Sequence, residues 1–453
     1  MVATPLNQGR QQYERSSLAE LSDTTTAKTP GQQIAVDLRR TIDHFVPDLY
    51  VRLENVVDPR ARRGYTMTEI LLGCLFMFIC KQGSRNAMNL DRDNTIFAQN
   101  FEKLFGKRLP HMDTVDDVLV LLDNHELERL KASLVATLIE KKVFGKYRLL
   151  GSLYRVAVDG TGIMTVDEGH CAHCLKRESK NGVTTYFHNI LEAKLITPNG
   201  FAISLATEWI ENPETYEKQD CELKAFQRLA DKLKGFFPRL PICVHADGLY
   251  PNKTFFEVCT AHNWRFIVTL KDGNLKSLWE EIEMELLTSK NTRRVIQHKA
   301  EQNYRWLVDL PYQDVRLSWI ECLETKDGKI GRFVFVTDIA VDFDNVLELG
   351  ESGRLRFKIE NEGFNTLKNG GYGLEHKYSR TSYTAAKNYV SMMQIAHLLN
   401  QLYELSSLAQ PLLTGKVTIR YLWKRLLSAL NELVFDDAGF AAAALSRFQI
   451  RYE

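Results

Sequence analysis

The sequence has no long apolar segment and no excess of charge of either sign. Its longest apolar run, residues 70–80 (ILLGCLFMFIC), is about half of the ~20 residues that a membrane-spanning helix needs, so it predicts a buried helix. No apolar stretch lies near the N-terminus, and we expect no secretory signal. The 58 Lys and Arg against 57 Asp and Glu give a net charge of +1. The total charge therefore does not by itself indicate a nucleic-acid partner.

Cysteine is sparse as well, and the sequence has no internal repeat and no low-complexity tract. Eight cysteines are scattered over 453 residues, which predicts a reduced, cytoplasmic setting in which most of them fill the core. The chain is 44% hydrophobic, 10% aromatic and 25% charged, a composition typical of globular proteins. Its length predicts two or three packed units. Because its longest apolar run is too short to span a bilayer, we expect no membrane partner.

The residue pattern changes along the chain and suggests four regions. Residues 1–32 are rich in Gln, Ser and Thr and predict a flexible arm. Residues 33–150 have apolar residues at helical intervals, and residues 151–385 alternate between strands and helices. Residues 386–453 return to a helical pattern. Within the third region, alternating segments at about 275–341 predict a β-rich insertion.

The first part of the α/β region predicts a mixed sheet. Three strands come first, and the second and third of them are joined at residues 198–200. An amphipathic helix, a strand, a second helix and a further strand follow. This order predicts an α/β core whose sheet is covered by helices on both faces.

Two acids follow apolar strand residues in this core. Asp159 ends the strand in VAVDGTG, and Asp247 ends the strand in ICVHADG. An acid at the end of a central strand, with a glycine beside it, is how α/β sheets present ligands to a cleft. Strands also stop at Asp because Asp starts turns, so neither acid alone is specific.

A third acid lies in residues 356–376 (RFKIENEGFNTLKNGGYGLEH), where Glu360 and Glu362 compete for the role. On an α-helix of about 100° per residue, Phe357 and Phe364 lie on one apolar stripe. Glu360 lies about 60° from Phe357 and Glu362 about 140° away, which predicts that Glu360 faces the protein interior. The alternative is that Glu360 only forms an ion pair at the edge of the core, with Arg356 one turn earlier or with a distant Lys.

Taken together, the acids indicate a metal site. Three carboxylates can hold two hard divalent cations about 3.5–4 Å apart, which promotes in-line displacement at a phosphoryl group. Oxygen ligands favour Mg²⁺ or Mn²⁺.

These segments resemble the DDE transposases of bacterial insertion sequences, over about residues 153–400. The resemblance is carried by VDGTG, DGLY, FVFVTDI and the Arg-x-x-x-Glu of residues 356–360. It implies an RNase H-like fold with a β-insertion before the third acid, and a catalytic, metal-binding triad of Asp159, Asp247 and Glu360. The tyrosine usual three residues before the arginine is Gly353 here, and the spacing from Glu360 to Lys368 is one residue longer than expected. Glu362 therefore remains a rival third acid.

The resemblance also implies DNA partners. Residues 354–425 contain eleven Lys or Arg, four Glu and no Asp, a balance of +7 that favours a DNA-binding surface over an ordinary solvated face. The candidate DNA contacts are Arg356, Lys358, Lys368, Lys377 and Arg380. The helical region at 33–150 matches the end-recognition part of transposases by position, and residues 104–119 are its best candidate for a helix-turn-helix.

The function that follows from the resemblance is cut-and-paste DNA transposition on double-stranded DNA, bound as a homodimer. Two alternatives stay open. One is a catalytically silent DNA-binding protein descended from a transposase, although all three acids are present. The other is an RNase H-fold nuclease that cleaves without strand transfer.

A separate motif, HCAHC at residues 170–174, places two thiols and two imidazoles close together. Cys-x-x-Cys is half of many zinc sites. One interpretation is a zinc site formed by Cys171, Cys174, His170 and His188, and the other is a reduced, metal-free loop.

Overall fold

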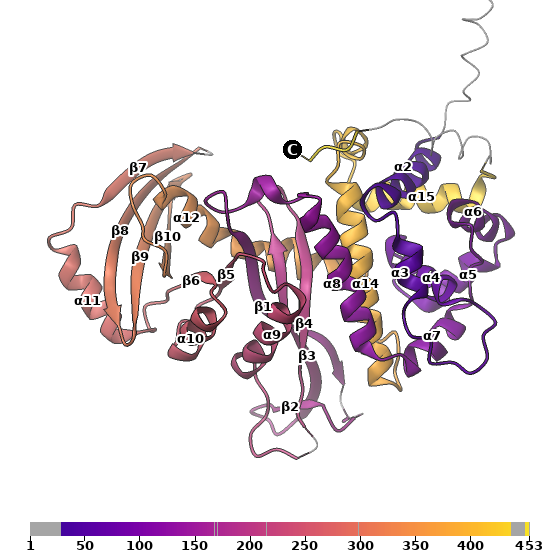
Figure 1. The fold of residues 1–453 in the computed structure, drawn as a ribbon, viewed down its shortest axis with the longest axis horizontal. Coiled ribbons are helices and arrows are strands. Elements are labelled where there is room, and N and C mark those ends of the chain that lie inside the picture. The colour runs from indigo at the N-terminus through magenta and orange to yellow at the C-terminus, as the bar shows by residue number, and fades with distance from the viewer. Residues whose placement is uncertain are drawn as a thin grey trace, which may run out of the picture.

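The computed structural model describes residues 29–435 and 449–452, except residues 167, 170, 214 and 298. It consists of a ten-stranded mixed sheet, helices on its faces and a helical region at one side (Figure 1). Nearly all of the predicted arm at residues 1–32 lies outside the described residues, and the helix α2 begins within its described end, at Pro30. Within the described residues, no helix combines the length and apolar composition needed to cross a bilayer.

The N-terminal region is helical, as predicted. The buried apolar run forms α4, which is buried along its whole length. Its start is fixed by a capping box, in which Thr66 and Glu69 each bond the other's backbone N–H. The helices of this region are α2 (Pro30–Phe45), α3 (Leu49–Glu54), α4 (Met67–Ile79), α5 (Arg85–Asp93), α6 (Thr95–Phe105), α7 (Met112–Leu121) and α8 (Asn124–Glu140).

The core sheet has the strand order β4-β3-β1-β5-β6. β3 is antiparallel to β1 and β4, whereas β5 and β6 run parallel to β1. Three antiparallel strands followed by two parallel ones are the RNase H-like arrangement, so the predicted fold class is confirmed. The elements are β1 (Tyr154–Val166), β2 (Leu175–Glu178), β3 (Thr184–Ile196), β4 (Ala202–Ile210), α9 (Glu222–Phe236), β5 (Ile242–Ala246), α10 (Lys253–Ala261) and β6 (Arg265–Thr269).

The β-rich insertion continues the core sheet. It begins with a helix, and its last strand pairs antiparallel with β6, so the insertion strands form one sheet with the core strands. Its elements are α11 (Lys276–Leu286), β7 (Thr292–Gln297), β8 (Ala300–Tyr312), β9 (Val315–Lys326) and β10 (Lys329–Thr337).

The chain then returns to helix and crosses back over the core. α14 lies between the sheet and the N-terminal helices and packs on α4, α7, α8 and β4 (Figure 1). It is buried on almost every side, and it therefore joins the N-terminal region to the core. The elements are α12 (Val346–Arg354), the 3₁₀ turn η2 (Leu355–Phe357), the π-helix η3 (Ile359–Asn365), α13 (Thr366–Asn369), α14 (Tyr383–Glu404) and α15 (Ile419–Glu432).

Candidate active site

Asp159 and Asp247 lie side by side on neighbouring parallel strands. Ala157 of β1 pairs with His245 of β5, and each acid is two residues further along its strand direction. The strand register thus brings together two acids that are 88 residues apart in the sequence. The predicted strand end is correct for Asp247, which directly follows β5, and wrong for Asp159, because β1 continues past it to Val166. The parallel pairing of β1 with β5 supplies the proximity of the two acids.

Asp159 is held by two hydrogen-bond donors. Its Oδ1 accepts the backbone N–H of Gly160 at 3.0 Å, and its Oδ2 lies 3.1 Å from Nη1 of Arg356. The pKa of Asp159 is raised to about 7, chiefly because of burial; the charge of Arg356 opposes the rise and the charge of Glu360 adds to it. A carboxyl group in this state changes charge near neutral pH.

Arg356 connects two of the predicted acids. Its side chain is only 9% exposed, and its Nη2 lies 2.9 Å from Oε1 of Glu360 while its Nη1 contacts Asp159. The helix η3, which carries Glu360, packs against β1, β3 and β4. The structure therefore directs Glu360 toward Asp159, and Arg356 neutralises charge between them.

The prediction that Glu360 faces the protein interior is wrong, because its side chain is 45% exposed, against 36% for Glu362. Phe357, from which the helical phase was counted, does not lie on the buried face. Its side chain is 50% exposed, and its ring covers the guanidinium of Arg356 at 4.5 Å. The residues that face the core are Ile359, Phe364 and Leu367. The segment winds first as a 3₁₀ turn and then as a π-helix, so a constant rotation of about 100° per residue does not apply.

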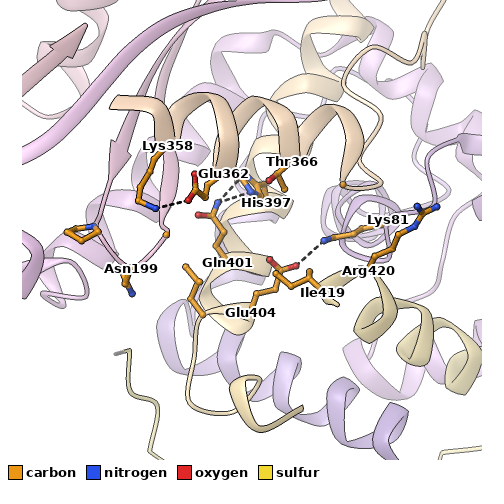
Figure 2. Close-up of a pocket in the computed structure, with 14 residues that line it drawn as sticks. Lys81, Asn199, Lys358, Glu362, Thr366, His397, Gln401, Glu404, Ile419 and Arg420 are labelled. Carbon is orange, nitrogen blue, oxygen red and sulfur yellow. Dashed lines mark hydrogen bonds and ion pairs between the residues drawn. The ribbon is translucent and has the colours of Figure 1, made fainter. Parts of the chain in front are cut away.

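The rival acid Glu362 points into a different environment. Its Oε1 lies 2.6 Å from Nζ of Lys358, and it lines a pocket of about 440 Å³ beneath η3 (Figure 2). Lys81 and Glu404, which pair at 3.0 Å, line the same pocket together with Gln401. Glu360 is not among the residues that line this pocket. The side chains of Glu360 and Glu362 thus lie on different sides of η3.

Asp247 is partly exposed, with 29% of its side chain accessible, against 19% for Asp159 and 45% for Glu360. Its Oδ1 accepts the backbone N–H of Leu249 at 2.8 Å, and its Oδ2 lies 3.4 Å from Nζ of Lys271. Its backbone carbonyl accepts the N–H of Tyr250 at 3.1 Å, which closes the turn after β5. The Asp-Gly pair therefore starts a turn and also exposes the carboxylate.

A fourth acid, Glu222, lies in the same cluster and was missed in the sequence. It is the first residue of α9, and its Oε2 accepts a hydrogen bond from the hydroxyl of Tyr250 at 3.4 Å. The pKa of Glu222 is raised, first by burial and then by the charge of Asp247. The charge of Glu222 in turn raises the pKa of Asp159. A Cβ on Gly160 would overlap the Glu222 carboxylate, so the glycine after Asp159 makes room for it. No local pattern marks this residue, because only the packing of α9 brings it here.

The donor set fits a hard divalent cation. All four groups offer carboxylate oxygens, and burial together with mutual repulsion raises the pKa of Asp159 and Glu222, a cost that a bound cation would relieve. The carboxylate oxygens of Asp159, Asp247 and Glu360, all of which are described, do not all lie within 4.8 Å of one another, so the three side chains do not yet surround one ion position. A cation shared by Asp159 and Glu360 would compete with Arg356 for their oxygens.

The five predicted DNA contacts have unequal exposure. Lys377 and Arg380 are exposed after α13. Lys358 pairs with Glu362, and Lys368 pairs with Glu375 at 2.8 Å. Arg356 is buried against two acids, so it is the least available of the five for a phosphate.

The Cys/His motif forms a compact cluster on the β1–β3 ribbon. Sγ of Cys171 and Sγ of Cys174 are 3.6 Å apart, and they lie 3.5 and 3.4 Å from Nε2 of His188. His170, the fourth predicted ligand, lies outside the described residues.

No protein-family model matches the chain, and neither does any curated protein. Among solved structures, the chain is similar to the piggyBac transposase in a cryo-EM structure of its synaptic complex with hairpin DNA, with a TM-score of 0.43 and 10% sequence identity. The match covers 90% of this chain and 82% of that chain. A likeness at this TM-score supports no inference about function. A functional proposal must therefore rest on the chain's own residues.

Proposed function

We propose that this chain is a DDE transposase of the insertion-sequence kind, which cuts DNA at the ends of its element and joins them to a target. The observation that carries the proposal is the placement of Asp159 and Asp247 on adjacent parallel strands, with Glu360 linked to Asp159 through Arg356. The sequence motifs VDGTG, DGLY and Arg-x-x-x-Glu support the same function because they resemble the family pattern, from which Gly353 and the spacing of Glu360 to Lys368 depart.

The proposed reaction has two displacements at phosphorus. In the first, a water oxygen forms a bond to phosphorus and the bond to the 3′ oxygen breaks, which leaves a 3′-hydroxyl and a 5′-phosphate. In the second, that 3′-hydroxyl attacks a phosphodiester of the target or of the opposite strand and releases another 3′ oxygen. Each displacement makes and breaks one P–O bond, so no further co-reactant is needed.

The proposed roles of the residues follow from their contacts. Asp159, Asp247 and Glu360 would hold Mg²⁺ or Mn²⁺, and Glu222, whose carboxylate lies beside Gly160, would contribute a further oxygen. Two such ions, when bound, would activate the attacking oxygen and stabilise the leaving oxygen. Arg356 would keep Asp159 and Glu360 directed toward each other. Lys377 and Arg380 are exposed cations that would bind the DNA backbone.

The test is strand cleavage of a DNA that carries the flanking ends of the element, with Mg²⁺ or Mn²⁺. The parent chain is compared with Asp159→Asn, Asp247→Asn, Glu360→Gln and Glu222→Gln. We expect the first three substitutions to lower cleavage by more than ~100-fold. Replacing a residue that only orients a metal ligand typically costs about 10–100-fold in activity, and replacing the ligand itself should cost at least as much. We expect a smaller loss for Glu222→Gln. DNA binding is measured in parallel by gel shift and is expected to persist.

The matched control is Glu362→Gln, which changes the neighbouring glutamate on the other side of η3. It should cut like the parent, because Glu362 pairs with Lys358 and lines a separate pocket. Loss of cleavage in Glu362→Gln with cleavage kept in Glu360→Gln would transfer the third role to Glu362. A parent chain that binds the ends and never cuts would favour the silent DNA-binding protein, and cutting without joining would favour a nuclease.

A further inference from the structure

We infer that Cys171, Cys174 and His188 form a structural zinc site that anchors the outer end of the β1–β3 ribbon to α14. The two sulfurs and the imidazole nitrogen lie 3.4–3.6 Å from one another. Tetrahedral zinc with ordinary Zn–S and Zn–N bonds separates its ligand atoms by roughly 3.6–3.8 Å. The cluster thus has about the spacing that a zinc ion requires.

The spacing of the sulfurs argues against a disulfide. The two Sγ atoms are 3.6 Å apart, well beyond the ~2.05 Å of an S–S bond. None of the eight cysteines, all of which the structure describes, is in a disulfide, and among them only Cys171 and Cys174 lie in a group of three potential metal ligands. Thiolate and imidazole ligands select zinc over the hard cations that suit the carboxylate cluster.

The ligands come from two segments that the sheet brings together. Cys171 and Cys174 lie in the loop between β1 and β2, whereas His188 is on β3, directly across from Met164 of β1. His188 is fully buried and Cys174 nearly so, as suits a structural site. The three groups would fill three of the four positions around a tetrahedral zinc ion, and one further donor would complete it.

The surroundings show what the site would hold together. The ring of His188 stacks on Tyr383, the first residue of α14, with centroids 4.2 Å apart. The side-chain amide of Asn212, just after β4, donates to the carbonyl of Cys174 at 3.0 Å. Nδ1 of His173 lies 3.0 Å from the carbonyl oxygen of Asn212, so this imidazole already has a partner outside the cluster. A zinc ion here would fix the loop to β3, to the end of β4 and to the start of α14.

The experiment measures metal in the untagged full-length chain, purified without chelator. We expect about one zinc per chain by elemental analysis. Replacement by Co²⁺ should produce thiolate-to-cobalt charge-transfer absorption and the intense visible bands of a tetrahedral site. Cys171→Ser, Cys174→Ser and His188→Ala should each lose most of the zinc, and the exposed Cys221→Ser should retain it as the matched control.

The cobalt spectrum of the unsubstituted chain keeps the test decisive if a variant fails to fold. A chain that purifies without zinc and shows no thiolate-to-cobalt band with equimolar Co²⁺ would overturn the proposal. Zinc retained at parental level in Cys171→Ser and Cys174→Ser would overturn it as well. Because no DNA is present in these measurements, their outcome is independent of the proposed transposase function.

Discussion

At the scale of single residues, the cluster of acids lowers the stability of the folded protein. Asp159 and Glu222 are partly buried carboxyl groups whose pKa values lie above their ordinary values, mainly because burial disfavours the charged form. A fold that needed only stability would place neutral groups there. The cluster therefore indicates a function for which the negative charges are required.

Asp159 should make the metal-free protein less stable at high pH. Its pKa is about 7 in the folded protein against an ordinary value of 3.8, so the folded state holds the proton more tightly. Stability is lost as the pH rises from about 4 to 7 and stays low above that. In EDTA, Asp159→Asn should thus be more stable than the parent, and its advantage should be roughly 2–3 kcal/mol larger at pH 8 than at pH 5.

The measurement is urea unfolding of both proteins at the two pH values. Asp314→Asn is the control, because the side chain of Asp314 is 86% exposed. Loss of this carboxylate should change the free energy of unfolding by a similarly small amount at pH 5 and at pH 8. An advantage of Asp159→Asn that does not grow with pH would show that the buried charge is not the cause.

The residues of the site were predictable to different degrees. Asp159 and Asp247 each follow a run of apolar strand residues, and that pattern is local, so the sequence reveals both, although β1 continues past Asp159 to Val166. Glu222 reaches them only because α9 packs its first residue against Gly160, a contact that no local pattern encodes. Glu360 was chosen by a helical rotation that the π-helix invalidates, and its ion pair with Arg356 is what directs it toward Asp159.

At the scale of elements, the packing of α12 explains the glycine at position 353, where the resemblance to DDE transposases predicts a tyrosine. Gly353 lies on α12 and faces β10. A Cβ built there would lie 2.6 Å from the ring of Phe335, which is itself buried. The close approach of helix and strand leaves no room for a larger side chain, and a tyrosine could not be accommodated without separating α12 from the sheet.

Gly353→Ala should therefore destabilise the protein by about 1–3 kcal/mol, the usual cost of overpacking a core contact. Gly235→Ala is the matched control, since Gly235 lies in α9 with no atom within 4 Å of its added Cβ. That change should be neutral or stabilise by up to ~1 kcal/mol, because alanine favours helix more than glycine does. Thermal melts of the two variants provide the comparison, and equal effects at both glycines would contradict the packing explanation.

At the scale of the whole molecule, a buried polar network joins the N-terminal helices to the core. Nζ of Lys131 on α8 lies 2.7 Å from Oε1 of Glu128 and donates at 2.6 Å to Oε1 of Gln394 on α14. Gln394 in turn donates to Glu192 on β3 at 2.6 Å, and Glu192 pairs with Lys194 at 2.8 Å. All five side chains are buried. The sequence could not reveal this network, because its members lie far apart in the chain and look like ordinary surface charges of helices and strands.

Lys131 is the residue on which the network depends. Burial lowers its pKa, and the charges of Glu128 and Glu192 oppose that shift, so the ammonium group and the carboxylates stabilise each other. Lys131→Met would leave two buried carboxylates with Lys194 as their remaining ammonium partner in the network. We expect a loss of about 3–5 kcal/mol in the free energy of unfolding, the cost of breaking a buried ion pair by removing one partner.

Arg129→Met supplies the control on the same helix. The Arg129 side chain is 61% exposed and its pair with Glu126 is at the surface, so this change should stay within about 0.5 kcal/mol of the parent. The double variant Glu128→Gln/Lys131→Met removes one of the stranded carboxylates and should regain part of the loss. Chemical unfolding followed by tryptophan fluorescence compares the four proteins. If Lys131→Met unfolds like the parent, the network is not what fixes the N-terminal helices to the core sheet, and the apolar packing around α14 must do so alone.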